Sequence, residues 1–91
     1  MTATRTRAGE ANERLTRALI SLAARGQRPR CGDYETSWMW LDEDPHIRAQ
    51  AALLCHDCPV IVECGDAADA NDERHFVWGG RDYTRQRKAA A

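Results

Sequence analysis

Four cysteines constrain this chain more than any other feature of its sequence. Cys55, Cys58 and Cys64 lie close together and Cys31 lies well before them, which gives the spacing C-x23-C-x2-C-x5-C. Thiolates are soft ligands, so the set can hold an iron–sulfur cluster, hold a structural zinc ion, or form two disulfides. A chain of 91 residues builds only a small core, and a metal cross-link commonly stabilises such a core.

The spacing and the expected compartment favour a cluster over zinc or disulfides. Zinc sites of four cysteines usually consist of two short C-x2-C pairs, whereas this chain has one such pair. Disulfides require an oxidising compartment. The first five residues lack the apolar run of a secretory signal, and no stretch has the length of a membrane span. We therefore expect a cytoplasmic protein with reduced thiols and no membrane contact.

Charge is distributed unevenly along the chain. Residues 1–30 carry seven Arg and two Glu, whereas residues 31–80 carry two Arg and eleven acidic residues. This acidic middle segment contains every cysteine and is a poor surface for nucleic acid. The C-terminal segment has four cations that could contact promoter DNA or could simply keep a solvated end soluble. They are Arg81, Arg85, Arg87 and Lys88.

The apolar residues repeat with helical periodicity. The expected helices cover residues 10–25, 44–55 and 58–71. Asp44 followed by Pro45 predicts a helix start, and Cys58 followed by Pro59 predicts another by the same logic. We expect Cys55 to end one helix and Cys64 to face inward on the next. The thiols would then converge on one point, with Cys31 supplied by a loop.

No strand-forming alternation is visible, so the predicted fold class is all-α. We expect a small bundle of three to four short helices wrapped around the cluster. The predicted organisation is a disordered N-terminus over residues 1–9, a helical cluster-binding domain over residues 10–80, and a basic tail over residues 81–91. Gly26 is the expected C-terminal cap of the first helix.

Two aromatic segments are candidate contact surfaces. Trp38 and Trp40 flank Met39 in an apolar island. They could screen the cluster and anchor a partner, or they could be ordinary core residues. After Trp78, the pair Gly79-Gly80 predicts a tight turn that needs positive φ or a close backbone approach. Such a turn would hold Trp78 in one orientation, which suits either core closure or display to a partner.

The sequence resembles the WhiB-like proteins of actinobacteria and their phages over about residues 31–88. The resemblance rests on C-x2-C-P-V, C-x5-C, V-W-G-G and a basic tail. It implies a small helical fold around a [4Fe–4S] cluster that reacts with oxygen or nitric oxide. The implied cluster ligands are Cys31, Cys55, Cys58 and Cys64.

The resemblance also implies a monomeric, non-enzymatic regulator that binds region 4 of the primary sigma factor of RNA polymerase. The turn assigned to this contact consists of Val77, Trp78, Gly79 and Gly80. One position departs from the family, because Phe76 stands where glycine usually precedes V-W-G-G. A phenylalanine cannot adopt every backbone conformation open to glycine, so the turn could enter at a different angle.

Two other functions remain open at this point. Cys55-x-x-Cys58 superficially matches a thiol–disulfide oxidoreductase motif, although that chemistry normally sits at a helix start in a βαβ setting. A zinc-stabilised protein-interaction module is the third possibility. A brown protein that absorbs visible light would indicate a cluster, because zinc and free thiols are colourless.

Overall fold

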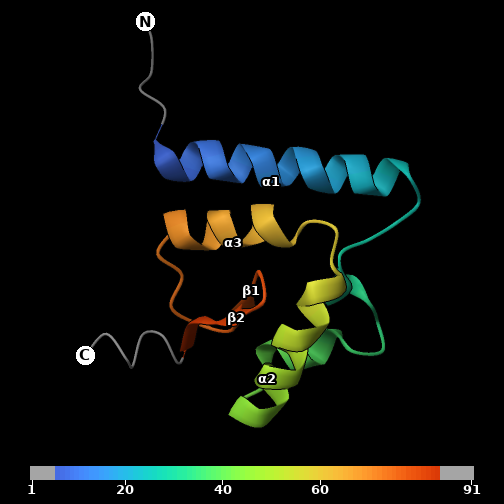
Figure 1. The fold of residues 1–91 in the computed structure, drawn as a ribbon, viewed down its shortest axis with the longest axis vertical. Helices are drawn as coiled ribbons and strands as arrows, with labels where there is room; N and C mark the ends of the chain where they lie inside the picture. Colours follow the sequence, from blue (N-terminus) through green and yellow to red (C-terminus); the bar gives the residue numbers. More distant parts are fainter. Residues whose placement is uncertain (1–5, 85–91) are drawn as a thin grey trace, which may run out of the picture.

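Three α-helices and three short 3-10 helices make up most of the part that the computed structural model describes, residues 6–84 (Figure 1). They are α1 (Arg7–Ala24), α2 (Pro45–Leu54) and α3 (Ile61–Ala70). The short 3-10 helices are η1 (Arg30–Gly32), η2 (Ser37–Leu41) and η3 (Cys55–Asp57). Strands β1 (Val77–Trp78) and β2 (Arg81–Asp82) follow α3. The fold is therefore mainly helical, as predicted, with a strand pair that the sequence did not indicate.

Helix α1 begins at Arg7, earlier than the predicted start at residue 10. The hydroxyl of Thr6 accepts a hydrogen bond of 2.8 Å from the Gly9 N–H and so caps the helix. Such a cap satisfies one of the N–H groups that a helix start leaves without a partner. Residues 7–9 are therefore helical rather than disordered, and residues 1–5 lie outside the described part of the chain.

Two predicted helix boundaries are confirmed. Gly26 has φ of 73° and ends α1, where a left-handed glycine is the common terminator. Asp44 caps α2, because its carboxylate accepts a hydrogen bond of 2.8 Å from the His46 N–H. Pro45 occupies the first helical position, where its missing N–H is not needed.

Helix α3 starts later than predicted, at Ile61 instead of Pro59. The chain first makes a turn in which the Ile61 N–H donates to the Cys58 carbonyl at 3.3 Å. Cys58 has no side-chain oxygen to accept from the first N–H groups, unlike Asp44 at the start of α2. Proline alone therefore did not fix the helix start here.

The predicted Gly-Gly turn connects β1 and β2 into an antiparallel hairpin. The paired residues are Val77 with Asp82 and Trp78 with Arg81. Gly79 and Gly80 have φ of 55° and 84°, and positive φ at both central residues is the mark of a type I′ turn. Strands of two residues are too short to show an alternating pattern, which explains why the all-α prediction missed them.

The hairpin turn packs directly against α3. A Cβ atom at Gly79 would lie 2.5 Å from the Gly65 Cα and 2.6 Å from the Gly65 nitrogen, closer than such atoms approach in proteins. A Cβ atom at Gly65 would meet nothing nearer than 3.7 Å. Gly79 is therefore required both for its conformation and for this close approach.

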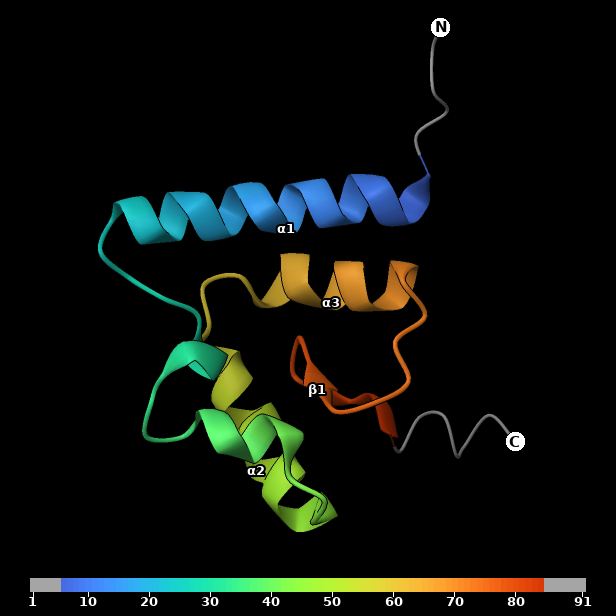
Figure 2. The same cartoon turned by 180° about the vertical axis from the view of Figure 1, so that it is seen from behind.

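The elements form layers with α3 in the middle. Helix α1 lies along one side of α3 and the hairpin lies on the other, while α2 packs against η2 and the hairpin (Figures 1 and 2). The core beside the hairpin is a cluster of five buried residues. They are Met39, Trp40, Ala51, Cys55 and Val77. In the part of the chain that the structure describes, no helix is both long and apolar enough to span a membrane.

A buried ion pair fastens the hairpin to α2. Arg48, which is 7% exposed, donates from Nε to Asp82 Oδ2 at 3.0 Å. Its Nη1 atom donates to the carbonyls of Asp42 and Glu43, each at 2.9 Å. One guanidinium thus joins strand β2 to the segment before α2. Because the ion pair is buried, removing one partner would strongly destabilise the fold.

A second polar link joins the chain after β2 to α3. The buried Tyr83 donates its hydroxyl to Asp69 Oδ1 at 2.6 Å, and Arg81 Nη2 donates to Asp69 Oδ2 at 2.8 Å. The ordered domain therefore continues to Thr84, past the predicted boundary at Gly80. Sequence reasoning had assigned this segment to a basic tail.

Candidate metal centre

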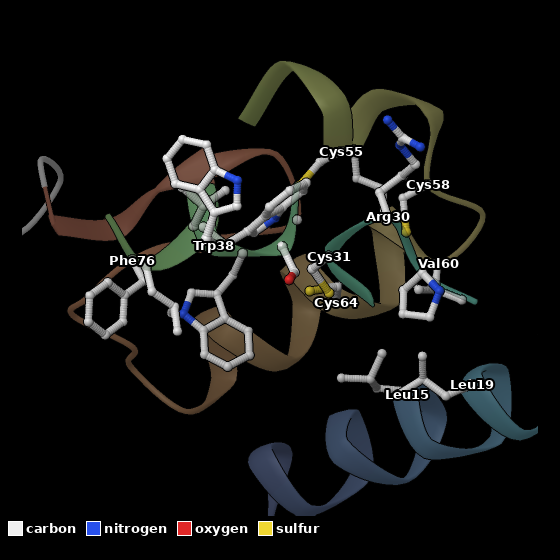
Figure 3. Close-up of a pocket in the computed structure, with 18 residues that line it drawn as sticks. Leu15, Leu19, Arg30, Cys31, Trp38, Cys55, Cys58, Val60, Cys64 and Phe76 are labelled. Atoms are coloured by element: carbon white, nitrogen blue, oxygen red, sulfur yellow. The ribbon is translucent and has the colours of Figure 1, made fainter. Parts of the chain in front are cut away.

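All four cysteines border one cavity of about 480 Å³ (Figure 3). All four are free thiols. Cys31 comes from η1, Cys55 and Cys58 from the two ends of the turn after α2, and Cys64 from α3. The remaining wall is largely apolar, and Leu15 and Leu19 of α1 close one side of it. The fold thus places the distant Cys31 at the same cavity as the other three cysteines.

The C-x2-C segment is a single tight turn. Cys55 ends α2, and the Cys58 N–H donates to the Cys55 carbonyl at 2.9 Å. The chain then turns through Pro59 and Val60, so that Cys64 lies in the first turns of α3 with its N–H bonded to the Val60 carbonyl at 2.9 Å. Local backbone hydrogen bonds therefore fix the relative backbone positions of Cys55, Cys58 and Cys64.

The two tryptophans of η2 have different environments. Trp40 is 5% exposed and its indole Nε1 donates to the Cys55 Sγ at 3.3 Å. Trp38 is 55% exposed and its Nε1 donates to the Glu35 carbonyl at 3.1 Å. The sequence left each of them open as a partner contact or a core residue; burial places Trp40 in the core, and Trp38 stays exposed beside the cavity.

Burial raises the pKa of two of the thiols. The pKa of Cys64 rises to about 11, mainly through loss of solvation, although the Gly79 backbone N–H partly offsets the effect. Loss of solvation also raises the pKa of Cys31, followed by the nearby Cys58 and Cys55. A thiol must lose its proton to become a ligand, so metal capture here releases protons.

The four cysteines fit a cluster by the chemistry of their thiols and by their placement around one cavity. Four soft thiols suit iron–sulfur clusters as well as zinc. No three His, Cys, Asp or Glu side chains between residues 6 and 84 are placed to share one metal ion, so the convergence of the thiols on one cluster stays a prediction. A four-iron cluster would be held by one thiolate from each of four cysteines, and all four cysteines border the same cavity.

The residues of the predicted sigma contact lie next to this cavity. Val77 is buried, Trp78 is half-buried, and Gly79 and Gly80 form the turn. The Trp78 Nε1 donates to the His75 carbonyl at 2.9 Å, which fixes the indole against its own hairpin. Trp78 and Val77 both line the cavity, so this surface and the cysteines adjoin.

The four predicted DNA-binding cations fall into two groups. Arg81 is held by Asp69, and its guanidinium lies 5.3 Å from the centre of the Tyr83 ring. The other three, Arg85, Arg87 and Lys88, lie outside the described residues.

A comparison with protein families identifies the chain. The family model described as transcription factor WhiB matches residues 26–89, which include all four cysteines and the hairpin. The chain belongs to the WhiB family.

Two curated relatives of this WhiB-family protein are named transcriptional regulators. Transcriptional regulator WhiB7 of Mycolicibacterium smegmatis is 40% identical over 42 residues, which cover 46% of this chain and 41% of the relative. Transcriptional regulator WhiB4 of Mycobacterium marinum is 48% identical over 40 residues, covering 44% and 34%. The match thus spans less than half the length of either relative. No solved structure matches the chain.

Proposed function

We propose that this WhiB-family protein regulates transcription through a [4Fe–4S] cluster and a contact with region 4 of the primary sigma factor. The proposed ligands are Cys31, Cys55, Cys58 and Cys64. The observation that carries the proposal is that these four thiols, from three separate elements, border one cavity. When bound, the cluster supplies a group that reacts with oxygen or nitric oxide.

Ligation would join parts of the chain that are far apart in sequence. Cys31 is the one ligand outside the segment that holds α2 and α3, and its helix η1 packs against η2 and η3. A bond from Cys31 to the shared cluster therefore ties η2, which carries Trp38, to the cysteine turn. Release of that bond would remove one of the ties on this segment, which still packs on α2, and so would couple cluster loss to the partner surface.

An apolar surface at the rim of the cavity supports the sigma contact. Trp38, Leu41 and Phe76 are 55%, 63% and 40% exposed, and all three border the same cavity as Trp78. Adjoining exposed apolar side chains of this kind mark protein-interaction sites. Aromatic anchors supply much of the binding energy in such interfaces. Trp78, oriented by its bond to His75, is the proposed anchor.

We also propose a contact with promoter DNA, but Arg81 is a poor candidate for it. Its guanidinium already pairs with Asp69, so moving it to a phosphate would first break that pair. The proposed DNA contact therefore rests on Arg85, Arg87 and Lys88.

The position of the C-x2-C turn disfavours thiol–disulfide exchange as the main activity. Cys55 is 6% exposed and ends α2. Redox motifs of this spacing place a reactive thiolate at a helix N-terminus, where the dipole stabilises negative charge. Here the turn follows a helix C-terminus, where the dipole opposes it.

Anaerobic purification tests the proposal directly. The protein should be brown, contain iron and acid-labile sulfide, and lose both when any one cysteine is replaced by serine. Co-expressed sigma region 4 should co-purify with the wild-type protein, and Trp78→Ala should lose it while keeping the colour. A colourless, zinc-loaded protein from strictly anaerobic preparation would contradict the cluster, and a Trp78→Ala variant that lost the colour but kept sigma would make Trp78 a core residue.

A further inference from the structure

The hydrogen bond from Trp40 to Cys55 differs from those of the other two tryptophans. The Trp40 Nε1 donates to a cysteine sulfur 15 positions away in the sequence, at 3.3 Å and in a buried setting. Trp38 and Trp78 donate instead to backbone carbonyls three residues before them, at 3.1 and 2.9 Å. Only the Trp40 indole therefore links the apolar core to a proposed cluster ligand.

This bond suits a charged sulfur better than a neutral one. A buried indole N–H needs an acceptor, because leaving such a donor unpaired in an apolar setting is costly. The sulfur of a neutral thiol is only a weak acceptor. A thiolate that ligates iron carries negative charge, and hydrogen bonds to ionised acceptors are roughly twice as strong as neutral ones. The arrangement is thus better matched to ligated Cys55 than to free Cys55.

Packing holds the donor in place. Trp40 and Cys55 belong to one buried cluster together with Met39, Ala51 and Val77, and η2 packs on α2 along this contact. Electrostatic effects of a fixed dipole are larger in such a dry setting than in water. The Trp40 N–H therefore acts on the sulfur as a fixed partial positive charge.

We propose that Trp40 is a positioning and tuning residue that raises the reduction potential of the cluster through its N–H bond to Cys55. This inference rests on the proposed function, because it requires a cluster on Cys55. One-electron reduction adds negative charge that is shared with the ligating sulfurs, so a donor to sulfur stabilises the reduced form more than the oxidised form. The electron comes from an external reductant such as dithionite, no covalent bond forms or breaks, and the indole keeps its proton.

Three variants separate the hydrogen bond from the packing of the ring. Trp40→Phe removes the N–H and part of the ring. Site-specific replacement of Trp40 by benzothienylalanine exchanges the N–H for a sulfur atom and keeps the shape of the side chain. Trp38→Phe is the matched control, because it removes an N–H from the same 3-10 helix that is bonded to a carbonyl instead of a cysteine.

The reduction potential is measured by an anaerobic dithionite titration followed by visible absorption and electron paramagnetic resonance, with circular dichroism as the check on folding. The potential should shift to a more negative value in both Trp40 variants and should stay at the wild-type value in Trp38→Phe. If the benzothienylalanine protein keeps wild-type helicity but, unlike the wild type and Trp38→Phe, fails to hold a cluster, the N–H bond to Cys55 is needed for the cluster itself.

A benzothienylalanine protein with the wild-type potential would overturn the inference and make Trp40 a packing residue only. A shift of the same size in Trp38→Phe would overturn it too, because the effect would then not depend on the bond to Cys55. Absence of iron and sulfide from the wild-type protein is a different result, which would instead overturn the proposed function.

Discussion

Replacing Gly79 by alanine should destabilise the protein strongly, because the new methyl group has no space. It would lie 2.5 Å from the Gly65 Cα and 2.6 Å from the Gly65 nitrogen, and both are backbone atoms of α3 that cannot rotate away. Gly79 also has φ of 55°, a conformation that costs a non-glycine residue roughly 1–2 kcal/mol. Overpacking adds about 1–3 kcal/mol. The combined loss of about 2–5 kcal/mol is a large share of the stability of a small domain.

Gly65→Ala is the matched control, because it adds a methyl group on the other side of the same contact. Its Cβ would meet Arg81 Nη2 at 3.7 Å and Gly79 Cα at 3.8 Å, which are ordinary contacts. Alanine in the middle of a helix is favoured over glycine by about 1 kcal/mol. Gly65→Ala should therefore be neutral or slightly stabilising, opposite in sign to Gly79→Ala.

The assay is urea unfolding of the anaerobically prepared protein, followed by far-ultraviolet circular dichroism. The free energies of unfolding of the two variants are compared with that of the wild type under the same conditions. A Gly79→Ala protein within about 0.5 kcal/mol of the wild type, in the range of ordinary surface substitutions, would refute the close packing of the hairpin on α3.

Three further predictions concern strain, ion pairing and pH. Phe76 has φ of 68°, a conformation that glycine adopts without strain and alanine does not. Phe76→Gly should therefore be more stable than Phe76→Ala by about 1 kcal/mol in urea unfolding, although glycine usually destabilises a protein relative to alanine. Equal stability of the two variants would show that the backbone at position 76 is not strained. Arg48→Ala should cost about 3–5 kcal/mol because it leaves the buried Asp82 unpaired, whereas Arg74→Ala, which breaks the exposed pair with Asp72, should change stability by less than about 1 kcal/mol. Hydrogen bonds from Tyr83 and then Arg81 lower the pKa of Asp69, so the stability they provide is present above the unfolded-state pKa, near 4, and is lost as pH falls through the lower folded-state pKa. The gap in melting temperature between wild type and Asp69→Asn should therefore narrow as pH falls from 7 toward 3, and a constant gap would exclude this linkage.

Local signals explain which helix boundaries the sequence predicted. Asp44 caps a helix through its own carboxylate, and Gly26 ends one because glycine readily adopts positive φ. Both effects can be inferred without knowing the fold. Cys58-Pro59 has the proline but lacks a capping oxygen, and the helix started two residues later. The two-residue strands gave no periodic signal at all.

Tertiary contacts explain what the sequence could not predict. Arg48 and Asp82 are separated by 34 positions, and nothing near either residue indicates the partner. Tyr83 likewise looked like part of a basic tail, although its hydroxyl anchors the chain to Asp69. The shared cavity of the cysteines was predictable from their number and spacing, but the burial of Trp40 depended on how η2 is rotated against α2.

The most direct test of the central claim is quantitation of iron and acid-labile sulfide in the full-length protein, purified without exposure to air. The account predicts about four irons and about four sulfides per chain, both lost together in Cys31→Ser, because the distant ligand on η1 is part of the same site. One zinc per chain without sulfide, or an undiminished iron content in Cys31→Ser, would contradict it.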